Sequence, residues 1–562
     1  MRTRKLATMM AGMATVALLA TACSSGSGSG DNSSSSGGGG SSDAVLTVGM
    51  PNGVQTNNQS PFATGSSATS LGYATVIYEP LMQVNDADPA ADPTPWLAKS
   101  VTWNDTYTEA TITPREGVKW SDGKDFTADD VAFNINLRKS TPAINTAALP
   151  YGDVTVGSDG TVKVTFTSGQ FVNQSKLYNL VMVPEHIWKD IKDPTTDPNT
   201  KPIGTGPFTL TSWTPQAATL DPNPSYWGGK SQVHQLRYSS YTDNNALTTA
   251  LTTGEVQWGW TFIADYENVY IAKDPDHYHQ YAAAGLGIDN MFLNVTTKPF
   301  SNKAFRQALN TALDRANITK IATSGVNPIL TNVSGLPLPA GQPFLNPDLD
   351  GKDYASSVDD AKSILKAAGY TWDGSGKLMD PDGEAVSFKI TDPTGWNDYN
   401  TAQDLVVATA KELGVDASAD KPPADNWFVD VPNGNFQAAF HWTDGGATPY
   451  DLYSDIFDGA QYVPVGQKAN WNFGRYQNDD ATAAFKTYAS SSSDDDRKAA
   501  MNKIQQIFVD DVPGIALWSR PNTAQYSTKN YVGWPDADNA YAGPQPTRPN
   551  AAEIVMKLKP AS

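Results

Sequence analysis

Segments of alternating apolar residues and segments with apolar residues at helical spacing follow one another along most of the chain. Alternation and short apolar runs predict strands at 45–50, 98–103, 109–114, 206–220, 235–241, 388–391 and 436–442. Apolar residues spaced by three and four predict helices at 71–82, 127–137, 305–323, 358–368, 402–413 and 494–509. Strands that alternate with helices over a whole chain imply an α/β fold.

Local signals indicate where some of these elements begin or end. Thr127 is the expected N-cap of a helix, and Asp130, three residues later, completes a capping-box-like arrangement. The tripeptide at 158–160, Ser-Asp-Gly, predicts the turn of a hairpin spanning 154–167. Gly369 is typical of the residue that ends a helix.

The first 43 residues have a different pattern. Basic residues precede an apolar run at 6–20 that is too short to span a bilayer, so the sequence predicts a secretory signal peptide at 1–22. Cys23, the chain's one cysteine, resembles the acylated cysteine of bacterial lipoproteins. That family prefers a leucine three residues before the cysteine, whereas Leu19 lies four before it. The alternative is an ordinary secreted protein with a spare thiol.

The segment after Cys23 reads as a linker. Residues 24–42 are Ser and Gly apart from Asp31 and Asn32, a composition typical of flexible chains with an r.m.s. span of roughly 24 Å at this length. We therefore expect residues 23–43 to comprise a lipidated cysteine and a tether. No later segment has the length of a membrane span, so a soluble, tethered body is expected.

Composition excludes several classes of protein. The net charge of −19 argues against a nucleic-acid partner, because phosphates need a basic surface. A single cysteine excludes an intramolecular disulfide. No nucleophile elbow, P-loop or zinc-protease motif is present, so we expect no enzyme and no cofactor. The pair His277 and His279 could share a metal on a strand, but an exposed loop is the favoured interpretation and no metal site is predicted.

A series of short motifs carries a family resemblance. In chain order they are IYEPL at 77–81, WLAKS at 96–100, GVKWSDG at 117–123, TADDV at 127–131, GTGPF at 204–208, NPSYW at 223–227, KPFSN at 298–302, RQA at 306–308, ALDR at 312–315 and LKAAGY at 365–370. Each motif is weak alone, but together and in this order the chain resembles the family 5 extracellular solute-binding proteins. These are the oligopeptide- and dipeptide-binding components of ABC importers.

The resemblance implies a fold and a division into domains. It implies a two-lobed periplasmic-binding-protein type II fold with an extra inserted α/β subdomain. Lobe I would comprise 44–75, 184–290 and 519–562, the inserted subdomain 76–183, and lobe II 291–518. The hinge would lie near 290–295 and 516–520, and closure around the ligand would create the form that the permease recognises.

In this family the ligand lies between the lobes, and three aromatic stretches match loops that face it. Trp442 ends the strand predicted at 436–442, and Trp427 precedes that strand. Trp258, Trp260 and Phe262 follow one another in lobe I, and both tryptophans would point the same way if the segment were extended. The alternative for each tryptophan is packing in the core.

The sequence leaves the ligand class open. Peptide binders of the family grip the ligand's amine with an aspartate three residues after the tryptophan that corresponds to Trp442, and here that residue is Gly445. Asp444 is the nearest acid and either takes the role or leaves the anchor absent. An oligopeptide is the first hypothesis and an oligosaccharide, stacked on Trp faces, is the alternative.

The resemblance also implies partners and a location. We expect a monomer that delivers its ligand to ABC permease subunits. It would be held by the Cys23 lipid on the extracytoplasmic face of the cell membrane.

Overall fold

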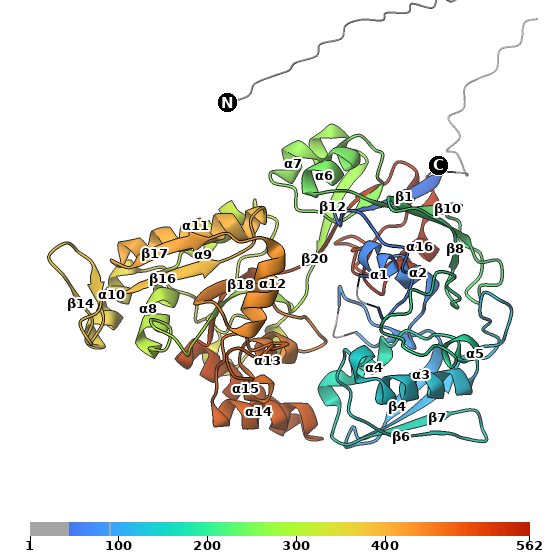
Figure 1. Cartoon of the computed structure of the whole chain (residues 1–562), viewed down its shortest axis with the longest axis horizontal. Coiled ribbons are helices and arrows are strands. Elements are labelled where there is room, and N and C mark those ends of the chain that lie inside the picture. The colour runs from blue at the N-terminus through green and yellow to red at the C-terminus, as the bar shows by residue number, and fades with distance from the viewer. Residues whose placement is uncertain (1–43, 64, 89–90, 562) are drawn as a thin grey trace, which may run out of the picture. The chain divides into compact units, whose positions relative to one another are not determined.

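The computed structural model describes residues 44–63, 65–88 and 91–561, and the signal peptide, Cys23 and tether predicted at 1–43 lie outside them. Within the described residues, helices accompany three larger sheets (Figure 1). The α/β fold class predicted from the sequence is confirmed. We name the parts built on these sheets lobe I, the inserted subdomain and lobe II.

Lobe I is built on a seven-stranded sheet. Its strands are β1 (Val45–Met50), β8 (Phe208–Trp213), β9 (Ala217–Pro222), β10 (Gln235–Ser240), β11 (Trp258–Gly259), β12 (Tyr278–Ala283) and β20 (Asn522–Ser527). They lie in the order β12-β20-β11-β1-β10-β9-β8, and β1 is parallel to both β10 and β11. The sheet thus joins the start, the middle and the end of the described chain. The other elements are α1 (Ser67–Leu71), α2 (Ala74–Ile77), α5 (Glu185–Trp188), α6 (Asn244–Thr252), α7 (Tyr266–Val269), α16 (Ala551–Lys557), β21 (Tyr531–Val532) and β22 (Lys559–Pro560).

The inserted subdomain has a four-stranded antiparallel sheet in the order β4-β5-β7-β6. Its elements are β2 (Met82–Gln83), β3 (Thr94–Pro95), β4 (Ala98–Trp103), β5 (Glu109–Pro114), α3 (Ala128–Ser140), β6 (Tyr151–Val156), β7 (Val162–Phe166) and α4 (Gln174–Tyr178). Helix α3 packs along this sheet (Figure 1). The predicted capping box is confirmed, because the side chain of Asp130 accepts a hydrogen bond from the backbone N–H of Thr127 (2.9 Å). The predicted hairpin is β6–β7.

Lobe II has a five-stranded sheet in the order β17-β16-β18-β13-β19. Its strands are β13 (Ile288–Leu293), β16 (Ser387–Thr391), β17 (Asp416–Asp420), β18 (Ala438–Trp442) and β19 (Gly514–Ser519), with a separate pair β14 (Thr371–Trp372) and β15 (Leu378–Met379). Its helices are α8 (Lys303–Ala312), α9 (Arg315–Ala322), α10 (Val358–Ala367), α11 (Asn397–Glu412), α12 (Ala424–Asn433), α13 (Tyr450–Phe457), α14 (Asp479–Ser490) and α15 (Asp494–Asp511). Consecutive side chains of β13 point to opposite faces of the sheet, so Met291 packs in one hydrophobic core and Phe292 in another. The sheet is therefore buried on both faces.

Two short segments connect the sheet of lobe I to the sheet of lobe II. Strand β12 of lobe I ends at Ala283 and β13 of lobe II begins at Ile288, while β19 ends at Ser519 and β20 begins at Asn522. The connections are therefore 284–287 and 520–521, which we call the crossovers. Residues 290–293, within the hinge expected near 290–295, pair with β18 or β19 inside lobe II, and Arg520 of the second expected hinge belongs to the second crossover. The position of the hinge stays a prediction.

Two predicted helices differ from the structure. Only α2 (Ala74–Ile77) lies within the helix expected at 71–82, because Gly72 ends the preceding α1 with a φ of 98° and the backbone becomes extended again at Tyr78. The helix expected at 305–323 is divided into α8 and α9, because Asp314 caps a new helix by accepting from the backbone N–H of Asn317 (3.0 Å). Among the described residues, no helix has the length and apolar character to cross a membrane.

Candidate ligand-binding cleft

Two adjoining cavities lie where the lobes meet. The larger has a volume of about 780 Å³, and its lining comes from lobe I, lobe II and the second crossover. The smaller has a volume of about 460 Å³ and also receives residues of the inserted subdomain. The two cavities share Trp260, Trp442, Arg520 and Pro521, so we treat them as two chambers of one cleft.

The larger chamber is lined by rings and side-chain amides. The aromatic residues are Trp260, Phe262, Trp396, Tyr399, Phe428 and Trp442. The amide residues are Asn52, Asn244, Asn245, Gln280, Asn327, Asn397 and Gln525. The Gln525 amide is already bonded to Thr261 and Gln280, but an asparagine side chain carries both a donor and an acceptor and each ring has an apolar face, so this lining suits a ligand that alternates apolar surface with hydroxyl or amide groups.

Trp442 forms part of the wall between the chambers. Strand β18 ends at this residue, so the indole leaves the sheet where strand ends face the cleft. The ring centroid of Trp442 lies 4.0 Å from that of His441, and the Arg520 guanidinium carbon lies 4.9 Å from the Trp442 ring. Burial lowers the pKa of His441 to about 3, so the imidazole is neutral at physiological pH and supports the indole without adding charge.

Trp258 and Trp260 have different surroundings, although the sequence suggested that they act together. Trp258 is fully buried in the core of lobe I, where its indole N–H donates to the carbonyl of Pro544 (2.8 Å). Strand β11 ends at Gly259, and the half-buried Trp260 beyond it lines both chambers. Phe262 lines the larger chamber. Of the two tryptophans, only Trp260 reaches the cleft in this conformation.

Trp427 lies beneath the cleft lining. It is 1% exposed on helix α12, and its indole N–H donates to the carbonyl of Thr391 (3.1 Å). It is not among the residues that line either chamber, whereas its neighbour Phe428 and the nearby Trp396 line the larger one. The helical conformation of 424–433 explains the difference, because successive helical side chains point in different directions.

Two carboxylates, of the buried Asp289 and the half-buried Asp398, form another part of the larger chamber. Asp289 on β13 accepts hydrogen bonds from the Tyr399 hydroxyl (2.5 Å) and the Trp518 indole (2.6 Å). Asp398, at the start of α11, also lines this chamber. Removal from water, together with the negative charge of Asp289, raises the pKa of Asp398 to about 6. The sequence offered no spacing that singled out these acids, because α11, β13 and β19 are far apart along the chain.

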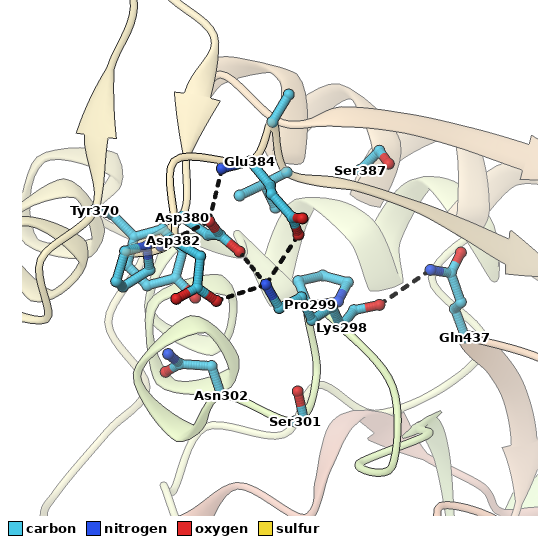
Figure 2. Close-up of a pocket in the computed structure, with 13 residues that line it drawn as sticks. Lys298, Pro299, Ser301, Asn302, Tyr370, Asp380, Asp382, Glu384, Ser387 and Gln437 are labelled. Carbon is cyan, nitrogen blue, oxygen red and sulfur yellow. Dashed lines mark hydrogen bonds and ion pairs between the residues drawn. The ribbon is translucent and has the colours of Figure 1, made fainter.

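A further cavity lies outside the cleft. It has a volume of about 530 Å³, and all its lining residues come from lobe II. Figure 2 shows Lys298 in its centre, where its amine makes ion pairs with Asp380 (2.8 Å), Asp382 (2.7 Å) and Glu384 (2.9 Å). These carboxylates raise the pKa of Lys298 above its usual value. Because its charged groups already pair with one another, we do not consider this cavity a second candidate ligand-binding site.

The family model for the middle part of family 5 bacterial extracellular solute-binding proteins matches residues 92–463. This chain belongs to that family. The matched residues cover most of the inserted subdomain, much of lobe I and much of lobe II. A family 5 protein is the solute-binding component of an ABC importer that acts outside the cytoplasm, and it is not an enzyme.

Curated relatives and solved structures agree with this assignment. The chain is 26% identical to the oligopeptide-binding protein AppA of Bacillus subtilis, covering 79% of this chain and 80% of that one. It is 30% identical to protein XP55 of Streptomyces lividans, covering 72% and 71%. The structure of a periplasmic oligopeptide-binding protein of Thermotoga maritima matches with a TM-score of 0.82 at 22% identity, covering 93% and 100%. The mannohexaose-bound form of that protein matches with a TM-score of 0.78 at 22% identity, covering 92% and 99%.

Gly445, the position at which the family resemblance implies an amine anchor, faces the first crossover. A Cβ atom at Gly445 would lie 3.2 Å from the backbone nitrogen of Gly287, so a larger side chain there would press against that segment. Asp444 lines the smaller chamber, and its backbone N–H donates to Asp455 (2.7 Å). Burial and the negative charge of Asp451 raise the pKa of Asp444. Its carboxylate therefore gains from any cation that enters the chamber.

Proposed function

We propose that this family 5 protein captures an oligosaccharide in the cleft and delivers it to an ABC permease. One observation carries the proposal: the larger chamber combines aromatic faces with many side-chain amides. A pyranose ring has apolar faces and a rim of hydroxyl groups, so indoles such as Trp260 and Trp442 would stack on the faces while amides bind the rim. The chamber volume of about 780 Å³ lies within the range of small-molecule sites.

An oligopeptide is the second candidate, and Asp444 is the observation that favours it. Its carboxylate lines the smaller chamber and could pair with a ligand ammonium group. The relative AppA is named as an oligopeptide-binding protein, which adds to this candidate. The sequence favoured a peptide as the ligand. We place the peptide second because Gly445, which has no carboxylate, lies against the first crossover at the position expected for the amine anchor.

Calorimetry with two ligand panels separates the candidates. One panel holds cello-, xylo- and manno-oligosaccharides of two to six units, and the other holds mixed peptides of two to nine residues. We expect saturable binding from the sugar panel, with a change in Trp fluorescence as the lobes close. Binding of peptides alone, weakened by N-acetylation and by Asp444→Asn, would establish the peptide instead. Turnover of a panel member would contradict a binding role.

We also propose that Cys23 is lipidated and holds the protein at the extracytoplasmic face of the membrane. The basic and apolar residues before it and the Ser/Gly segment at 24–42 support this. A receptor tethered beside its permease acts at a higher effective concentration than a free one. Delivery to the permease and the anchor are parts of one mechanism in this proposal.

A further inference from the structure

Arg520 lies where the lobes and the chambers meet. It belongs to the second crossover, and its backbone N–H donates to the carbonyl of Gly287 in the first crossover (2.9 Å). Its side chain lines both chambers and lies over the Trp442 ring at 4.9 Å. A ligand that extends from one chamber into the other therefore passes the Arg520 guanidinium.

The hydrogen-bonding capacity of Arg520 is not used by the described residues. Its guanidinium makes neither an ion pair nor a hydrogen bond with them and lies over the Trp442 ring. Buried arginines elsewhere behave differently: Arg306 donates to the carbonyls of Phe300, Asp511 and Val512, all within 3.1 Å. The nitrogens of Arg306 are thus bonded to the protein itself, whereas the guanidinium donors of Arg520 remain available to a molecule in the cleft.

Asp398 supplies the complementary group. It lines the larger chamber with Arg520, and the positive charge of Arg520 lowers its pKa against the effect of burial, so the two charges sense each other without forming an ion pair. The carboxylate of Asp289 is already occupied by Tyr399 and Trp518. No side-chain donor among the described residues reaches Asp398. The larger chamber thus contains both the Arg520 guanidinium, which only donates hydrogen bonds, and the Asp398 carboxylate, which only accepts them when it is ionised.

We propose that Arg520 and Asp398 determine specificity by binding hydroxyl groups of one sugar unit, an inference that rests on the proposed oligosaccharide ligand. A hydroxyl group both donates and accepts, so it satisfies a guanidinium and a carboxylate at once. An anionic group is a poorer match for this place, because Asp243, Asp289 and Asp398 line the same chamber with Arg520 as its one cation among the described residues. Lysine would not replace Arg520 well, because it lacks the planar fork that holds two oxygens.

The test compares variants against the tightest oligosaccharide of the panel and its mono-deoxy analogues, by calorimetry on the mature protein. Arg520→Gln and Asp398→Asn should each lower the affinity for the parent sugar by roughly 10–100-fold, because each leaves a buried sugar hydroxyl without one of its hydrogen bonds. The wild type should discriminate strongly against one particular deoxy analogue, and Arg520→Gln should bind that analogue about as well as the parent sugar. Arg520→Lys should recover only part of the loss. Arg237→Gln, an exposed position on β10 that lines neither chamber, is the matched control and should change nothing.

A double-mutant cycle shows whether the two residues act on the same sugar unit. If they do, Arg520→Gln combined with Asp398→Asn costs less than the product of the two single effects. Full wild-type affinity and discrimination in Arg520→Gln would overturn the inference while leaving the proposed function intact. If Arg520→Gln lost affinity but still discriminated between the parent sugar and each deoxy analogue as the wild type does, Arg520 would act on the geometry of the hinge. That result would also overturn the inference. A wild-type protein that binds no sugar would overturn the proposed function and this inference together.

Discussion

Glu79 gives the sharpest prediction about stability. It is fully buried at the junction of lobe I and the inserted subdomain, where its carboxylate accepts from the Trp96 indole (2.7 Å), the Tyr226 hydroxyl (2.8 Å) and the Trp227 indole (3.0 Å). Burial raises the pKa of Glu79 from 4.5 to about 7, and the three donors oppose that rise. At neutral pH the group is therefore close to half protonated.

The raised pKa makes the stability of the fold depend on pH. Between pH 4.5 and about 7 the folded state holds more protons at Glu79 than the unfolded state does, so unfolding free energy falls as pH rises through this window. The stabilisation is fully present below pH 4.5 and is lost above the folded-state pKa. A shift of 2.5 pKa units, from 4.5 to about 7, corresponds to about 3 kcal/mol.

Glu79→Gln tests this reasoning, because the amide does not titrate. Urea unfolding of both proteins at several pH values gives the free-energy difference between them, in which the shared titrating groups cancel. The advantage of the wild type over the variant should shrink by about 3 kcal/mol between pH 4.5 and about pH 8. Below pH 4.5 the variant should be about 1–3 kcal/mol less stable than the protonated wild type, because an amide N–H would face one of the three donors. A difference that stays flat across the window would refute the buried, protonated carboxyl group.

Three further predictions concern the cleft and the anchor. Trp442→Ala should weaken the ligand by on the order of 30-fold in calorimetry, because it removes an aromatic face shared by both chambers, whereas Trp103→Ala in the inserted subdomain should not. Gly445→Ala should lower the affinity for the ligand about 3–10-fold, because the added Cβ would lie 3.2 Å from the Gly287 nitrogen and would hinder closure of the lobes. Unchanged affinity would mean that the first crossover shifts without cost. Cys23→Ser should move the protein from the membrane fraction to the medium and leave ligand affinity unchanged, and retained membrane association would contradict the lipid anchor.

Much of the fold was predictable because the signals are local. The capping box at Thr127 and Asp130 and the turn at 158–160 depend on residues a few positions apart, so the sequence contains all the necessary partners. The breaks at Gly72 and Asp314 were missed, although each is also a local signal, because helical spacing continued across them. The alternation of strands and helices was enough to assign the α/β class.

The cleft was predictable only in part. Its aromatic character and the roles expected of Trp260 and Trp442 came from the sequence and the family resemblance, and the structure places both in the lining. Trp396, Asp398 and Arg520 were not singled out as ligand contacts. Asp398 lies on α11 and Arg520 between β19 and β20, more than a hundred positions apart, and no periodicity of the chain relates them.

The sequence by itself therefore determined the α/β class and the family, because the first follows from the order of strand and helix patterns and the second from motifs in order along the chain. The export signal at 1–22 stays a prediction from the sequence. Only the tertiary structure decided which aromatic side chains line the cleft. Trp258 and Trp427 resemble Trp260 and Trp442 in the sequence, yet the first pair is buried in cores and the second pair lines the cleft. The reason is that exposure depends on which strands and helices pack together from distant parts of the chain, and packing is a property of the folded molecule.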